Sequence, residues 1–292
     1  MKFGVVYPQI EMGGDPQAVH DIGVGVEEAG FDHLLVYDHV VGAEHADREP
    51  PLWGPYTERD PFHEPLVMFG YLAAVTSRIE LATGVMILPQ RQTALVAQQV
   101  ADADLLSRER VRLGVGTGWN YVEYDALGQD FETRGRRLDE QIELLRQLWA
   151  QVLVTFDGRF DHLERACINP RPRRQIPIWI GGFSEAAYRR GGRLGDGFTF
   201  AGDVDASLDG MVRVRHHMAE AHRSADTFGF ELIATRAKSA AQVAETAERW
   251  QSAGGTHLAV LTIKLGLDTA AAHLDYARSV KDSLDIRLGA SR

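Results

Sequence analysis

A histidine and an aspartate stand at the end of an apolar run near the N-terminus. Residues 33–37 are strand-forming, and Asp38 and His39 follow them directly. Because histidine titrates near neutral pH, His39 could move a proton there, and the adjacent carboxylate could orient polar groups beside it. On position alone, a histidine that only caps the strand through backbone hydrogen bonds is an equally good interpretation.

A glycine interrupts a later apolar run, at Thr83-Gly84-Val85. A glycine among strand-forming residues indicates a bulge or a close approach of the backbone to a ligand. A glycine needed only for packing fits this position as well.

The segment 114–120 carries three glycines and ends in Trp119 and Asn120. Its spacing matches a dinucleotide fingerprint only superficially, because Trp119 takes the place of the third glycine and the run follows the fourth strand. We therefore reject a Rossmann fold. Glycines here, including Gly118, would let a flat ring lie against the backbone, with Thr117 and Asn120 as polar contacts.

The segment Gly181-Gly182-Phe183-Ser184 precedes a predicted helix. Glycines and a serine at a helix N-terminus offer free backbone N–H groups, the helix dipole and a hydroxyl to a phosphate. An ordinary serine N-cap after a tight loop is the alternative. Glu185 argues mildly against a phosphate unless its side chain points outward.

Other catalytic patterns are weak or missing from the sequence. Asp38, His39 and His45 could ligate a metal, but there is no H-E-x-x-H motif, so we expect no metal site. There is no G-x-S-x-G nucleophile motif and no phosphate-binding P-loop. We expect the single cysteine, Cys167, to be buried rather than catalytic.

The elements that would position these residues alternate between short apolar runs and helical patterns. Asp15 and Pro16 begin one helix, and Ser239 with Gln242 forms a capping box at another. Eight runs with a helix after each predict an α/β fold that closes as a (β/α)8 TIM barrel. The eight runs are residues 3–7, 33–37, 79–83, 111–115, 176–180, 197–200, 231–234 and 257–261.

Two insertions interrupt the repeat within a predicted single domain of residues 1–292. Residues 42–62, rich in proline and aromatic residues, follow strand 2 at the end where barrel active sites lie. Residues 151–175 precede strand 5 and contain Asp157-Gly158, a plausible hairpin turn.

Composition limits the class of protein. A formal charge of −10 argues against nucleic-acid binding, which needs a basic surface. A lone cysteine, no signal peptide and no membrane-length apolar stretch predict a cytoplasmic globular protein that does not associate with membranes.

Four motifs together carry a family resemblance. The segments 37–39, 82–89, 114–119 and 178–182, in this order, resemble the bacterial luciferase-like flavin-dependent monooxygenase family. The branch most similar uses the deazaflavin coenzyme F420, an 8-hydroxy-5-deazaflavin. The similarity runs from the first strand to the final helix.

The resemblance implies a role for each motif. His39 falls at the family's active-site histidine and Asp38 at its usual neighbour. Thr83, Gly84 and Val85 fall at a non-proline cis peptide bond that supports the cofactor ring. Thr117, Gly118 and Asn120 fall at a cofactor-contacting turn, and Gly181, Gly182, Phe183 and Ser184 at the phosphate turn. One departure is Ser107-Arg108-Glu109-Arg110, where relatives commonly carry two glycines; we expect it to affect stability and not chemistry.

These implications predict an oxidoreductase that transfers a hydride between F420 and a small organic substrate. The predicted substrate pocket lies between Tyr7, Trp53, Tyr56 and Trp119. The alternatives are an FMN-dependent monooxygenase, a non-catalytic flavin-binding protein and a metal-dependent hydrolase on the same barrel. Because the family often dimerises, a homodimer is open to the chain.

Overall fold

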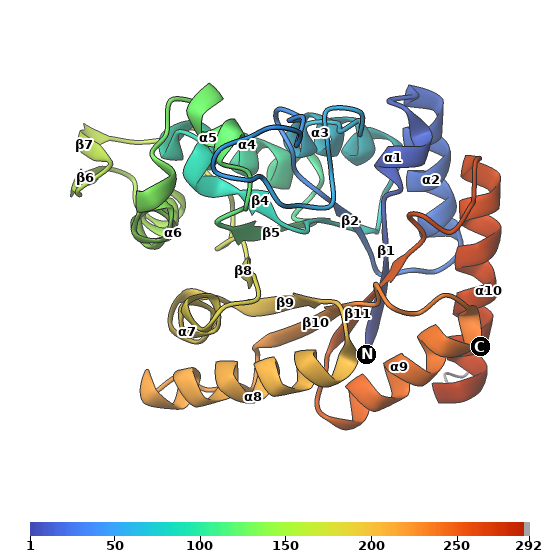
Figure 1. Ribbon diagram of the computed structural model, residues 1–292. Helices are drawn as coiled ribbons and strands as arrows, with labels where there is room; N and C mark the ends of the chain where they lie inside the picture. The colour runs from blue at the N-terminus through green and yellow to red at the C-terminus, as the bar shows by residue number, and fades with distance from the viewer. Residues whose placement is uncertain (289–292) are drawn as a thin grey trace.

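A computed structural model describes residues 1–288 of the chain. Parallel strands surrounded by helices form its body (Figure 1). The strands of the barrel are β1 (Lys2–Val6), β2 (His33–Val36), β3 (Glu80–Thr83), β4 (Met86–Ile87), β5 (Val111–Gly116), β8 (Ile178–Gly181), β9 (Gly197–Ala201), β10 (Gly229–Ile233) and β11 (His257–Leu261).

The strand pairings close this sheet on itself. The order is β3-β2-β1-β11-β10-β9-β8-β5-β4, and a further pairing of β3 with β5 joins the two ends. In that pairing Leu81 lies opposite Val111 and Ala82 opposite Arg112. Strands β3 and β4 are two parts of one barrel strand, separated at Gly84 and Val85. The predicted (β/α)8 barrel is therefore confirmed.

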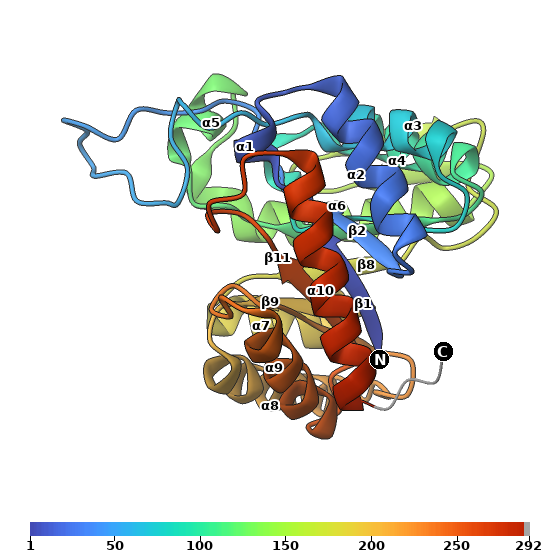
Figure 2. The ribbon, with the colours of Figure 1, turned by 90° about the vertical axis from the view of Figure 1, so that its right-hand side faces the viewer.

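Helices follow the barrel strands and cover their outer surface (Figure 2). The predicted N-caps are present: Asp15 accepts a hydrogen bond from Gln17 N, and Ser239 accepts one from Gln242 N. The principal helices are α2 (Pro16–Glu28), α3 (Pro65–Val75), α4 (Thr93–Leu106), α6 (Arg134–Ala150), α7 (Glu185–Leu194), α8 (Val204–Glu220), α9 (Ala240–Ser252) and α10 (Ala270–Leu288). Shorter helical segments are α1 (Gln9–Met12), η1 (Leu88–Gln90), α5 (Tyr121–Ala126) and η2 (Phe131–Thr133).

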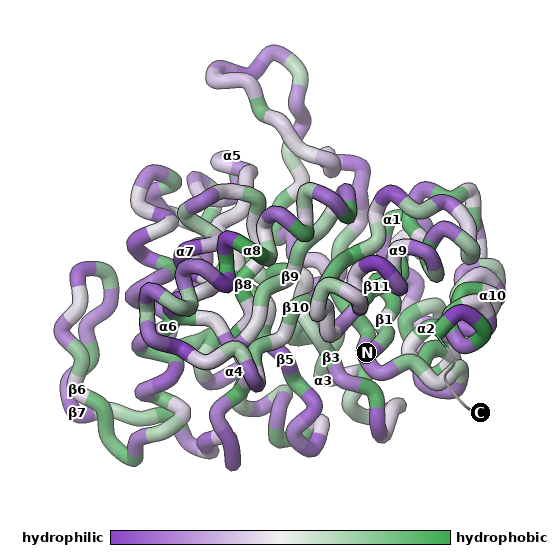
Figure 3. The backbone as a smooth tube through the Cα atoms, turned by 90° about the horizontal axis from the view of Figure 1, so that it is seen from below, coloured by the Kyte–Doolittle hydropathy of each residue, from purple (hydrophilic) through white to green (hydrophobic). Residues whose placement is uncertain are grey.

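Alternation along each strand separates two buried regions. Side chains such as Val5, Leu34 and Leu113 point outward and pack under the helices in the main core. The intervening side chains point into the barrel, where Val6 and Leu35 belong to a second apolar cluster. Strands at the centre of the molecule are accordingly largely hydrophobic, whereas the surrounding helices mix both characters (Figure 3).

Charged groups fill the lower part of the barrel, near the strand N-termini. Glu231 lies 2.6 Å from His33 Nε2 and 2.8 Å from Arg112 Nη1, and Arg112 also pairs with Glu80 at 2.6 Å. Burial opposes ionisation of Glu231, but Arg112 and His33 outweigh it and hold its pKa well below the usual range. Burial, with the charges of Arg112 and His33, lowers the pKa of His257 to about 3. This network closes the bottom of the barrel and leaves the upper end for ligands.

The two insertions differ in structure. Residues 42–62 contain no helix or strand and extend beyond the upper end of the barrel (blue, left in Figure 2). The second insertion forms a hairpin of β6 (Val154–Asp157) and β7 (His162–Ala166), as its turn sequence predicts. Cys167, expected to be buried, is exposed at the end of this hairpin, because the hairpin projects from the body (Figure 1). Within residues 1–288 no helix has the length and apolar character needed to cross a membrane.

Candidate active site

His39 is held by a buried carboxylate, Glu123. His39 Nδ1 lies 3.2 Å from Glu123 Oε1 and 3.3 Å from Oε2, and the two side chains are 11% and 1% exposed. Glu123 Oε1 also accepts hydrogen bonds from the backbone N–H groups of Val40, at 2.8 Å, and Val41, at 3.1 Å. Gln90 Nε2 donates to Glu123 Oε2 at 3.2 Å. One carboxylate thus fixes both the imidazole and the backbone that follows it.

The charge of Glu123 follows from these contacts. Burial raises the pKa of its carboxyl, but the hydrogen bond and charge of His39, with the N–H of Val41 and the amide of Gln90, outweigh burial and lower the pKa below its ordinary value. An ionised Glu123 accepts a hydrogen bond from His39 when the imidazole proton is on Nδ1. Nε2 is then the ring nitrogen left to exchange a proton with a substrate.

Asp38 joins the end of β2 to the end of β4. Its carboxylate is buried, accepts the backbone N–H of Ile87 at 2.9 Å and pairs with Arg91 at 2.7 Å. Arg91 also pairs with Glu64 at 3.0 Å, at the start of α3. Asp38 therefore fixes the strand ends on either side of the barrel bulge, next to His39.

The bulge lies between Gly84 and Val85. Their peptide bond is cis, at the position that the family resemblance implies. The Val85 side chain reaches toward β5 and β8: a Cβ added at Gly116 or Gly181 would lie 2.6 Å from a Val85 methyl carbon. Thr83, expected to touch a cofactor, is fully buried and donates from Oγ1 to Gly114 O at 2.7 Å. Thr83 therefore holds the bulge from beneath.

The upper interior of the barrel around Val85 is apolar. The cluster there consists of Val6, Leu35, Ile233, Ala259 and Ile263, with Ile10, Tyr37, Ala201 and Leu261 packed against it. Toward β5, β8 and β9 the inward positions are small, because they are Gly116, Gly181 and Ala201. A low floor with a partly exposed Val85 at its centre is suited to a flat ring system.

The turn after β8 leads directly into the N-terminus of α7. Gly182 has φ +146°, and Ser184 is the N-cap of α7, its hydroxyl accepting from Ala187 N. Glu185 points away from the turn, since its carboxylate lies 2.6 Å from His217 Nε2 and 3.3 Å from Arg213 on α8. Phe183 is 77% exposed beside it. The carboxylate of Glu185 therefore does not face the turn.

The turn after β5 is partly committed to the protein itself. Gly118 has φ +65° and lies against Ile87. Asn120 caps α5 by accepting from Val122 N at 3.1 Å, and its amide donates to Val41 O at 3.4 Å. The backbone oxygen of Thr117 accepts from Tyr124 Oη at 2.7 Å. Of the two polar side chains predicted here, that of Asn120 is therefore already engaged.

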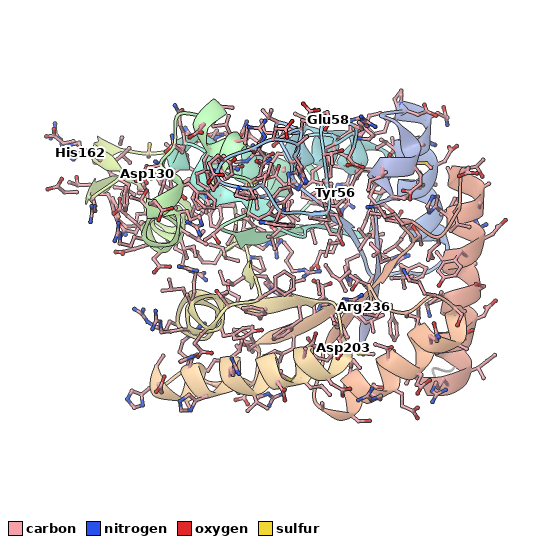
Figure 4. All side chains as sticks on the ribbon, in the orientation of Figure 1. Tyr56, Glu58, Asp130, His162, Asp203 and Arg236 are labelled. Carbon is pink, nitrogen blue, oxygen red and sulfur yellow. The ribbon has the colours of Figure 1, made fainter. Side chains whose placement is uncertain are left out.

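Three aromatic rings surround His39, and we call them the aromatic cage: Tyr56, Phe62 and Trp119. Their ring centroids lie 5.3, 4.7 and 5.5 Å from that of His39. Tyr56 and Phe62 come from residues 42–62, and Trp119 from the turn after β5. In Figure 4, Tyr56 and the neighbouring Glu58 lie in the upper half of the view.

Two residues predicted to line the substrate pocket lie elsewhere. Tyr7 is fully buried in the main core, because it follows the inward-facing Val6 and so points outward under the helices. Trp53 is 78% exposed on the outside of the insertion. Tyr56 and Trp119, in contrast, lie beside His39.

Sequence reasoning missed Glu123, Gln90, Arg91 and Phe62. Glu123 stands three residues after the N-cap Asn120, where a capping box would place it, so its pattern indicates a local role. Its contact with His39 spans 84 positions and has no local signal. Phe62 is the last residue of the predicted insertion 42–62, whose aromatic content already indicates a binding loop.

No group of three or more histidine, cysteine, aspartate or glutamate side chains that could hold a metal ion occurs in residues 1–288. Of the residues considered as ligands, Asp38 is paired with Arg91 and His39 with Glu123. The upper end of the barrel therefore combines an apolar floor, a glycine-containing turn at a helix N-terminus and a buried histidine–glutamate pair, an arrangement that suits an oxidoreductase with an organic ring cofactor.

Comparisons with known proteins identify the family. The sequence profile of the luciferase-like monooxygenase family matches residues 1–282, so the chain belongs to this family. An uncharacterised protein of Mycobacterium tuberculosis is 34% identical over 204 residues, covering 68% of this chain and 70% of the relative. An F420-dependent glucose-6-phosphate dehydrogenase of Kineococcus radiotolerans is 34% identical over 187 residues, covering 63% of this chain but only 52% of the relative.

Solved structures share the fold at low identity. An F420-dependent secondary alcohol dehydrogenase in complex with an F420–acetone adduct superposes with a TM-score of 0.77 at 17% identity, covering 97% of this chain and 98% of the other. A monooxygenase from Streptomyces bottropensis superposes with a TM-score of 0.78 at 17% identity, covering 99% and 100%.

Proposed function

We propose that this protein is an F420-dependent oxidoreductase that transfers a hydride between the deazaflavin and a small organic substrate. The observation that carries the proposal is the His39–Glu123 pair beside the floor formed at Val85. Relatives named F420-dependent dehydrogenases, 32–34% identical to this chain, support the choice of cofactor.

The residues present fit such a cofactor. Val85, seated between Gly116 and Gly181, gives a ring a flat apolar support that a side chain at either glycine would disrupt. We propose that the ring lies there, with Thr117 and Gly118 at its edge and its phosphate at Gly181, Gly182 and Ser184. Gln90 Oε1, buried beside Glu123, has no hydrogen-bond partner within residues 1–288 and could accept one from a bound group.

In this mechanism the chain's own residues bind, orient and exchange a proton. When bound, the deazaflavin supplies two-electron hydride chemistry. Glu123 holds Nδ1–H of His39, so Nε2 accepts the hydroxyl proton of an alcohol during oxidation or returns it to a carbonyl during reduction. The aromatic cage excludes water from His39, and Asp38 keeps the strand ends in place through Arg91 and Ile87.

The proposal is tested by titrating the purified apo-protein with F420 and, separately, with FMN, following absorbance and fluorescence. We expect saturable F420 binding, and His39→Ala should keep that affinity while lowering turnover by about 100-fold or more. Tight FMN binding without F420 binding would instead indicate the FMN-dependent monooxygenase. F420 binding that His39→Ala and wild type share, with no turnover by either, would indicate a non-catalytic binding protein.

We also propose that the protein works as one domain in the cytoplasm. We further propose that two copies form a homodimer through α3. The helix has no charged residue, and its outer face presents Val67, Gly70, Tyr71 and Ala74, with Val67 74% exposed. On a chain of charge −10, an uncharged face with a small central residue favours close contact with its own copy. Light scattering should give twice the mass of one chain, and Tyr71→Glu should halve it; a monomeric wild type at micromolar concentration would refute this arrangement.

A further inference from the structure

The aromatic cage limits which substrates can reach His39. Resting on the proposed function, we infer that the substrate is a small, uncharged, largely apolar alcohol or ketone, and not a sugar phosphate or another anion. In the oxidation, the hydroxyl oxygen would lose its proton to His39 Nε2 and the hydroxyl carbon would lose a hydride, so that the alcohol becomes a ketone. A bound oxidised F420 would supply the acceptor for this hydride and its two electrons.

The walls around His39 are aromatic and uncharged. Phe62, Tyr56 and Trp119 meet it at ring distances of 4.7 to 5.5 Å, and Tyr56 and Phe62 pack on each other at 5.0 Å. Gly54 leaves room for this packing, since a Cβ there would lie 2.3 Å from the Trp119 ring. Apolar walls at this spacing favour an apolar or flat molecule and give an anion nothing to bind.

The charged groups close to the cage are already paired. Asp38 and Glu64 share Arg91, and Glu123 is engaged by His39, Val40, Val41 and Gln90. An anionic substrate would have to displace these pairs or bind without them. Either route loses the strong charge-assisted contacts that phosphate recognition requires.

Lys264 lies beside the cage. Its ammonium lies 5.9 Å from the centroid of the Tyr56 ring and 3.4 Å from Pro55 O. Its backbone N–H donates to Glu11, so a carboxylate stands next to it. A single exposed lysine beside a carboxylate is a weak site for a phosphate dianion. Arg236 and Asp203 lie over the other half of the barrel in Figure 4, away from Tyr56.

The phenols of Tyr37 and Tyr56 are neutral polar groups at the aromatic cage. Burial raises the pKa of the Tyr37 and Tyr56 phenols, so both stay neutral donors and acceptors near His39. Together with His39 Nε2 they can satisfy one substrate oxygen well. A further hydroxyl of a sugar that lies against the aromatic walls without a partner would cost about 1–3 kcal/mol.

The test compares neutral and anionic substrates on the F420-loaded enzyme. We expect 2-butanol, cyclohexanol or 1-phenylethanol to be oxidised with a kcat/KM at least 100-fold above that for glucose-6-phosphate or glucose. Phe62→Ala should lower kcat/KM for the neutral alcohol about 10-fold without changing the Kd for F420. Lys264→Ala should leave the neutral reaction unchanged.

Ligand binding gives a second readout that does not depend on turnover. A neutral ketone should quench tryptophan fluorescence, and Trp119→Phe should remove that quenching. Trp53→Phe is the control, because Trp53 lies on the insertion that supplies Tyr56 and Phe62 but is 78% exposed outside the cage, so quenching should persist. Glucose-6-phosphate turnover that Lys264→Ala abolishes would overturn the inference while leaving the proposed function intact. Failure to bind F420 would overturn the proposed function instead, whereas ketone quenching at Trp119 would still support the substrate class.

Discussion

Replacing Glu123 by glutamine would alter the proton on His39 with almost no change in shape. The carboxylate accepts from Val40 N at 2.8 Å and Val41 N at 3.1 Å through Oε1, and from Gln90 Nε2 at 3.2 Å through Oε2, while both oxygens face His39 Nδ1. A glutamine oxygen can keep the two backbone contacts. Its NH2 group would then face two donors, so either His39 must change tautomer or two hydrogen bonds are lost.

The expected magnitudes follow from that count. Two hydrogen bonds to a charged group contribute roughly 1.5–3 kcal/mol each, and rotation of the Gln90 amide recovers part of the loss, so unfolding should become easier by about 3 kcal/mol. A histidine with the proton on Nε2 no longer accepts one there. We therefore expect kcat to fall by about 100-fold, near the low end of the usual contribution of a general base, with KM little changed.

The lowered pKa of Glu123 adds a pH signature. Its stabilising contribution is complete above the ordinary glutamate pKa and is lost as pH falls through the lower folded-state value. Urea unfolding between pH 3 and 7 should thus show less acid sensitivity in Glu123→Gln than in wild type. Nitrogen NMR of His39 in Glu123→Gln should show that the proton has moved from Nδ1 to Nε2. The control is Glu58→Gln, in the insertion 42–62, whose carboxylate pairs with the exposed Arg59. Unchanged kcat and an unchanged tautomer would refute the role assigned to Glu123.

Three further predictions concern the barrel. Gly116→Ala should weaken F420 binding at least tenfold and cost about 1–3 kcal/mol of stability, because the new methyl overlaps Val85, and calorimetry should show the loss of stability relieved when Val85→Ala is added. Arg108 and Glu109 have φ values of 60° and 65°, so glycine at either position should raise the free energy of unfolding by about 1 kcal/mol, measured in urea, and leave kcat unchanged. A loss of stability would contradict the expected relief of backbone strain. Because His257 is neutral down to about pH 3, folding loses stability as pH falls below its ordinary pKa, and His257→Gln should flatten that decline by at most about 3 kcal/mol at pH 4; parallel pH curves would show that another group causes it.

The barrel and the position of its bulge could be predicted, and several contacts at the site could not. Strand and helix periodicity is local, so the eight strand positions follow from the sequence, and family motifs placed the cis bond at Gly84. The partner of His39 could not be found, because Glu123 reaches it across 84 residues and its spacing fits a helix cap.

Other contacts failed for identifiable reasons. Tyr7 was misplaced by one step of strand alternation, which the inward Val6 would have indicated. Trp53 was assigned by residue type alone, and nothing in an irregular insertion specifies which aromatic side chains turn inward. The residues that act together here meet only because the barrel closes.

The two sides of the site come from parts of the chain under different constraints. The floor under the proposed cofactor belongs to the barrel strands, whose glycines and bulge tolerate almost no change. Tyr56 and Phe62 belong to residues 42–62, which are tied to the body at few points, such as Pro50 O to Tyr121 Oη at 2.7 Å. Substitutions in this loop can alter selectivity without disturbing the redox centre. A lineage, or an engineer exchanging this one segment, could therefore direct a single hydride-transfer scaffold to new alcohols and ketones.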